Sequence, residues 1–66
     1  MKARINGESI DISRQMSIKE FLESRTINPK AVVVEYNRRI LQPREWDGIF
    51  LKENDSLEIV SFVGGG

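Results

Sequence analysis

Met1-Lys2-Ala3-Arg4-Ile5-Asn6-Gly7-Glu8-Ser9-Ile10-Asp11-Ile12 begins the chain with two alternating apolar and polar stretches around Asn6-Gly7. Asn-Gly is the strongest short hairpin signal, because both residues tolerate positive φ. A two-residue turn pairs Ala3 with Ile10 and brings the apolar residues of both stretches to one face. The turn signal and the alternation agree, so this segment predicts an antiparallel hairpin.

A short helix is predicted after the hairpin. Ser17-Ile18-Lys19-Glu20 has the form of a capping box, in which the serine and the glutamate each accept a backbone N–H at the start of a helix. Apolar residues then recur at helical spacing. The helix must end before Asn28-Pro29, because a residue ahead of proline avoids the helical region. We therefore expect a helix over residues 18–25.

The second half of the chain predicts three more strands. Residues 31–36 are rich in β-branched side chains and indicate a central strand. Residues 39–41 fit a short edge strand, and residues 56–62 fit the last strand. Between them, residues 43–46 suggest one helical turn, and Asn54 suggests a tight turn in left-handed geometry.

This order of elements predicts the fold class. One amphipathic helix can cover one face of a mixed sheet of four to five strands, which gives a two-layer α+β domain. A hairpin, a crossover helix and further strands in a chain of this size fit a β-grasp sheet. We expect residues 1–63 to form the domain and residues 64–66 to form a flexible C-terminal glycine tail.

Composition narrows the functional classes. The 66 residues are enough for one domain, and ten basic against ten acidic residues argue against nucleic-acid binding. The chain has no apolar run of membrane-spanning length and no signal peptide, so we expect a cytoplasmic protein without membrane contact. It has no cysteine and no histidine, which removes the usual zinc ligands and the commonest general base. We expect no metal site and no catalytic residue.

The chain ends Phe62-Val63-Gly64-Gly65-Gly66. A run of glycines weakens a strand or helix, but backbone without side chains can enter a narrow channel. At roughly 3.3–3.6 Å per extended residue, three glycines carry the terminal carboxylate about 10 Å beyond Val63. The ending therefore suggests a tail that a partner grips, and the alternative is a frayed terminus without a role.

The last strand suggests a docking surface beside this tail. If Leu57 and Ile59 lie beneath the helix, Val60 and Phe62 are exposed on the open face of the sheet, with Val33 near them. An exposed apolar patch of this kind suggests partner binding. The alternative is ordinary scattered surface hydrophobes, which need no explanation.

Charged residues allow two interpretations. Arg38, Arg39 and Arg44 form a loose basic cluster, which either docks onto an acidic partner surface or protects an edge strand from pairing with another sheet. Trp46 is expected in the core. The carboxylates outside the capping box, Asp55 among them, are expected to lie solvated on the surface.

Residues 34–66 resemble the bacterial sulfur carrier proteins of thiamine (thiazole) biosynthesis, which are ubiquitin-like β-grasp proteins. The resemblance extends loosely over the whole chain through its length, its first turn and its single helix. It departs from the family pattern in the position of the Pro-Arg pair, in an asparagine where the last turn usually has glycine, and in a third glycine. The residues that carry it are Asn37, Ile40, Pro43-Arg44-Glu45-Trp46, Asp55, the apolar last strand and Gly65-Gly66.

The resemblance implies a function. An E1-like adenylating enzyme would use ATP to convert the carboxylate of Gly66 to an acyl-adenylate. A sulfur donor enzyme would then displace AMP and leave a thiocarboxylate, whose sulfur thiazole synthase would accept. Gly64, Gly65 and Gly66 would thread into the partner sites. The carrier would be a co-substrate without a bound cofactor, not an enzyme.

Three alternatives stay open. The small subunit of molybdopterin synthase shares the fold, the tail and the thiocarboxylate. A ubiquitin-like modifier would be joined to lysines through Gly66. A non-covalent β-grasp interaction module would use neither a thiocarboxylate nor a linkage through Gly66. Removal of Gly65 and Gly66 would leave only this last function intact.

Overall fold

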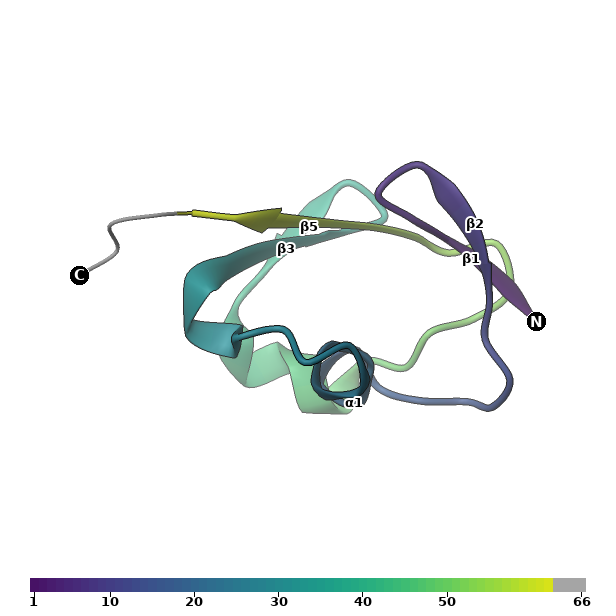
Figure 1. The fold of residues 1–66 in the computed structure, drawn as a ribbon, viewed down its shortest axis with the longest axis horizontal. Helices are drawn as coiled ribbons and strands as arrows, with labels where there is room; N and C mark the ends of the chain where they lie inside the picture. Colours follow the sequence, from purple (N-terminus) through teal and green to yellow (C-terminus); the bar gives the residue numbers. More distant parts are fainter. Residues whose placement is uncertain (63–66) are drawn as a thin grey trace.

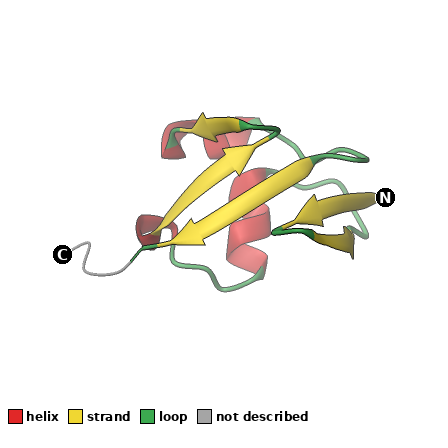
Figure 2. Ribbon diagram, turned by 90° about the horizontal axis from the view of Figure 1, so that it is seen from above, coloured by secondary structure: helices red, strands yellow, loops and turns green. Residues whose placement is uncertain are grey.

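The computed structural model describes residues 1–62 of the 66. It has the expected two-layer α+β arrangement, with a mixed sheet in the order β2-β1-β5-β3-β4. Figure 1 shows the sheet as one layer, with α1 and η2 packed below it, and Figure 2 shows the two long central strands from above. In chain order the elements are β1 (Lys2–Ile5), β2 (Glu8–Asp11), α1 (Ile18–Ser24), the 3-10 helix η1 (Pro29–Ala31), β3 (Val32–Tyr36), β4 (Arg39–Leu41), the 3-10 helix η2 (Pro43–Gly48) and β5 (Ser56–Ser61).

Asparagine in left-handed geometry forms the tight turns. Asn6 and Gly7 have φ values of 51° and 85°, and β1 pairs with β2 in the predicted register, with Ala3 opposite Ile10. Asn54 has φ 68°, as predicted. A further turn, Asn37-Arg38 between β3 and β4, places both residues at positive φ, 48° and 73°. The sequence indicated the asparagine there but not the left-handed arginine.

The capping box fixes the start of α1. The backbone N–H of Glu20 donates to Ser17 Oγ at 3.1 Å, and the N–H of Ser17 donates to Glu20 Oε1 at 2.9 Å. The helix ends at Ser24, one residue earlier than predicted, with Arg25 as its C-cap. Within residues 1–62 no helix is long and apolar enough to cross a bilayer.

The central strand begins one residue later than predicted, because a single 3-10 turn precedes it. Asn28 caps this turn, and its Oδ1 accepts from the N–H of Lys30 at 3.0 Å. Pro29 suits the first position of the turn, where the N–H that proline lacks would have no partner within the turn. The last strand, β5, ends at Ser61, one residue before the predicted end at Phe62. The N–H of Phe62 nevertheless donates to the carbonyl of Ala31 at 3.0 Å, so the chain keeps its course beside β3.

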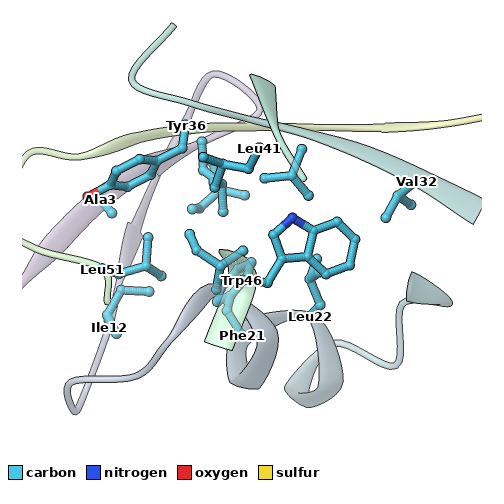
Figure 3. Packing of buried hydrophobic residues seen from close by; sticks show 13 residues of the cluster. Ala3, Ile12, Phe21, Leu22, Val32, Tyr36, Leu41, Trp46 and Leu51 are labelled. Carbon is cyan, nitrogen blue, oxygen red and sulfur yellow. The ribbon is translucent and has the colours of Figure 1, made fainter. Parts of the chain in front are cut away.

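One hydrophobic core fills the space between the sheet and the layer of α1 and η2 (Figure 3). Trp46 from η2 is only 3% exposed, which confirms its predicted core position. Its indole nitrogen is buried and has no hydrogen-bond partner within residues 1–62. The largest fully buried side chains are those of Ile18, Leu22, Leu51, Leu57 and Val34.

Asp55 is buried, so the prediction that it is a solvated surface carboxylate was wrong. It accepts from the hydroxyl of Tyr36 at 2.7 Å, from the N–H of Lys52 at 2.7 Å and from the amide of Asn37 at 3.2 Å. Asn37 in turn accepts from the N–H of Ser56 at 2.8 Å. The network joins the end of β3 to the start of β5. Burial raises the pKa of Tyr36, the hydrogen bond to Asp55 raises it further, and Lys52 opposes both.

We predict that Asp55→Ala lowers the free energy of unfolding by about 2–3 kcal/mol, because it leaves a buried hydroxyl and a backbone N–H without an acceptor. Urea denaturation measures the change. Asp47→Ala is the matched control, since Asp47 is exposed and its loss should cost within about 0.5 kcal/mol. Equal effects of the two substitutions would contradict a structural role for the Asp55 network.

Candidate partner-binding site at the base of the glycine tail

β5 carries the chain toward the glycines and lies between β1 and β3 in the sheet. The side chain of Asn6 holds it from one side. Asn6 Oδ1 accepts from the N–H of Ile59 at 2.7 Å, and its Nδ2 donates to the carbonyl of Ile59 at 3.3 Å. On the β3 side, the N–H of Phe62 donates to the carbonyl of Ala31. The segment that leads into the tail is therefore fixed on the domain as far as Phe62.

Three exposed apolar side chains lie around the end of β5 on the open face of the sheet, and we call them the open-face patch. Val33 is 41% exposed, Val60 59% and Phe62 43%. Val33 and Val60 are directly opposite each other on β3 and β5. Leu57, which points to the other face of β5, is fully buried. The predicted exposure is confirmed, and the docking role of the patch stays a prediction.

Two carboxylates border the open-face patch, and the sequence did not reveal them as a pair. Glu35 on β3 lies directly opposite Glu58 on β5, and Ile40 on β4, 60% exposed, lies opposite Glu35 on its other side. Like charges directly opposite in a sheet are destabilising. Only the register between β3 and β5 shows this pairing, because 23 positions separate the two residues. The open face therefore combines apolar and acidic groups.

The structure places the three arginines in different settings. Arg38 lies in the turn between β3 and β4, and Arg44 lies on η2, where it lines a hollow beside α1. Arg39 Nη1 is 3.2 Å from Glu45 Oε1 in an exposed ion pair, a kind that contributes little stability. The N–H of Gln42 lowers the pKa of Glu45, and Arg39 lowers it further. Because β4 is at the edge of the sheet, the edge-protection interpretation is consistent with the fold.

Val63, Gly64, Gly65 and Gly66 lie outside the described residues. The predicted domain boundary, the threading of the three glycines and the modification of Gly66 accordingly stay predictions. Within residues 1–62 no group of three or more His, Cys, Asp or Glu side chains is placed to hold a metal ion. What the structure does establish is that the open-face patch reaches Phe62, the last described residue before the glycine segment.

A mixed five-stranded sheet with one main helix, whose central β5 leads into a glycine-rich end, defines a ubiquitin-like β-grasp protein of the carrier class. The family model of the ThiS family matches residues 3–66. The chain belongs to the ThiS family and is a sulfur carrier of thiamine biosynthesis.

Individual relatives agree with this family. The sulfur carrier protein ThiS of Bacillus subtilis is 33% identical over 64 residues, 96% of this chain and 97% of that protein. A thiazole synthase of Paramagnetospirillum magneticum is 35% identical over 66 residues, which are the whole of this chain but 20% of that protein. The crystal structure of a thiamine biosynthesis protein (ThiS) from Geobacter metallireducens superimposes with a TM-score of 0.86 at 26% identity and covers 100% of both chains. These matches favour a sulfur carrier of thiamine biosynthesis over the small subunit of molybdopterin synthase.

Proposed function

We propose that an E1-like enzyme adenylates the terminal carboxylate of Gly66, and that a sulfur donor enzyme converts the adenylate to a thiocarboxylate. The observation that carries the proposal is that the family match extends through the glycines to residue 66. The site geometry supports it, because the chain is fixed on the domain as far as Phe62, two residues before the first of the three glycines.

The chemistry explains why a carrier needs a second enzyme. A carboxylate is a poor electrophile, so its oxygen first attacks the α-phosphorus of ATP and expels pyrophosphate. The acyl-adenylate then has AMP as a leaving group, and a sulfur nucleophile attacks the carbonyl carbon and displaces it. The chain has no cysteine and so no thiol to act as the sulfur nucleophile, and we assign the sulfur to a partner enzyme. The carrier acts as a co-substrate, not as an enzyme, and ATP is consumed at the partner's site.

Thiazole synthase is the proposed acceptor of the sulfur. The support is that the thiazole synthases of Paramagnetospirillum magneticum and Magnetococcus marinus each contain a region similar to the whole of this chain, 35% and 30% identical. A carrier-like region within the same polypeptide as the synthase fits a sulfur transfer between the two. The proposed compartment is the cytoplasm, which contains the ATP that the activation consumes.

The first test is pyrophosphate release by a ThiS-type adenylating enzyme with ATP and this chain as substrate. We expect one pyrophosphate per carrier when AMP is not displaced. The matched control lacks Gly65 and Gly66 but keeps the whole described fold. It should release no pyrophosphate, because the carboxylate of Gly66 is missing. Equal release with both chains would contradict activation at the tail. A carrier found instead in isopeptide linkage to lysine would identify a protein modifier.

A further inference from the structure

β5 loses its neighbour on the β1 side before the strand ends. β1 pairs with β5 only from Arg4 opposite Ser56 to Ile5 opposite Leu57. The chain then turns away toward β2. The side chain of Asn6 extends the pairing to Ile59, as described above. Beyond Ile59, none of residues 1–62 pairs with this edge of β5.

The hydrogen-bond pattern shows which groups this leaves open. In an antiparallel pair, the backbone groups of successive residues point alternately toward and away from the neighbouring strand. The N–H of Phe62 bonds to Ala31 beside β3, whereas the carbonyl of Leu57 accepts from the N–H of Asn6 on the opposite side. Even-numbered residues of β5 therefore face β3, and odd-numbered ones face the β1 side. By this alternation the N–H and the carbonyl of Ser61 face the open side, and Ser61 is exposed.

A hollow lies beside this open edge. Its volume is about 260 Å³, and Ile59 and Ser61 line it together with Asn6, Ile27 and Arg25. Its walls are partly apolar and partly polar. A strand placed against the edge at Ser61 has room there for a side chain that points toward the helix layer.

We propose that the open edge of β5 at Ser61 receives an extended segment of the adenylating enzyme as an added strand. Unpaired strand N–H and carbonyl groups are a template for strand addition, and in the described part of β5 those of Ser61 are the pair left open on this edge. The occupant is the activating partner because Ser61 is only five residues before Gly66, roughly 17 Å of extended chain, and an enzyme acting on Gly66 must approach this stretch. The added strand would hold the chain extended toward the adenylation site. The inference rests on the proposed function.

Ser61→Pro tests the edge selectively. Proline removes the N–H of Ser61, which no bond to β3 uses, and proline is tolerated where a strand N–H faces solvent. We expect the affinity for the adenylating enzyme to fall about tenfold, the effect of one lost hydrogen bond, with the urea midpoint of the free carrier unchanged. Ser61→Ala is the matched control, since it keeps the N–H and should bind as the unsubstituted chain does. Unchanged affinity in a folded Ser61→Pro carrier would overturn the proposal.

Amide hydrogen exchange on the unsubstituted chain decides the question even if the proline variant unfolds. In the free carrier, the amide of Ser61 should exchange fast and that of Phe62 slowly. In the complex with the adenylating enzyme, Ser61 should become protected. If pyrophosphate is released but Ser61 stays unprotected in the complex, the added strand is wrong and the proposed function stands. Protection of Ser61 in concentrated carrier alone would assign the edge to a second copy and would also overturn the inference. Absence of pyrophosphate release would reject the proposed function itself.

Discussion

One alanine added after Gly66 is expected to abolish thiocarboxylate formation. The added residue replaces the carboxylate of Gly66 by an amide and moves the new carboxylate about 3.5 Å further along the tail. Both changes take the nucleophilic oxygen away from the α-phosphorus of ATP, and a near-attack geometry tolerates only small displacements. The described domain is untouched, so binding of the partner through other surfaces should be retained.

The matched control is Gly48→Ala, which adds a methyl group where no heavy atom outside the adjoining backbone and the two neighbouring residues lies within 4 Å of the new Cβ. This variant should be activated like the unsubstituted chain. Intact-protein mass spectrometry reports both the thiocarboxylate and any trimming of the added alanine. An extended chain that stays untrimmed and is still converted at the normal rate would contradict activation at Gly66.

Phe62→Asp and Val60→Asp are expected to weaken binding to the adenylating enzyme about tenfold to a hundredfold, or about 1.4–2.7 kcal/mol. Each substitution places a carboxylate where the partner would cover an apolar side chain. The new charge also adds to that of Glu58, which lies on the same face of β5. Because both side chains are largely exposed, 43% and 59%, the fold should lose little stability.

Phe50→Asp is the control for this docking face. Phe50 is 45% exposed, close to the value for Phe62, but it lies outside the open-face patch. Calorimetric titration with the adenylating enzyme should therefore give an unchanged affinity for this variant. If Phe62→Asp and Phe50→Asp bind equally well, the patch is ordinary surface and not a docking face.

Local sequence signals predicted the local structure well. The hairpin at Asn6-Gly7, the capping box at Ser17 and the left-handed Asn54 each depend on residues a few positions apart, and all three are confirmed. The boundary errors amount to one residue for α1, β3 and β5, and to two for η2, which ends at Gly48 and not at residue 46. They arise where a short 3-10 turn, such as the one at Pro29, or the last backbone hydrogen bond between two strands sets the end of an element. The pattern of apolar residues does not indicate either of these.

Contacts between distant residues were not predictable in the same way. Asp55 appeared as a surface carboxylate because its partner Tyr36 is 19 positions away. The bonds between Asn6 and Ile59 span 53 positions, and they depend on β5 entering the sheet beside β1. Such features require the strand order, which one sequence does not specify. The exposure of Val60 was predictable because alternation along one strand suffices for it.

The most direct test of the sulfur carrier mechanism is the mass of the intact chain after incubation with its adenylating enzyme, ATP and a sulfur donor. We predict a gain equal to the replacement of one oxygen by sulfur, with fragmentation placing the sulfur at Gly66. An unmodified mass, obtained with an enzyme shown to be active on another carrier, would contradict the mechanism.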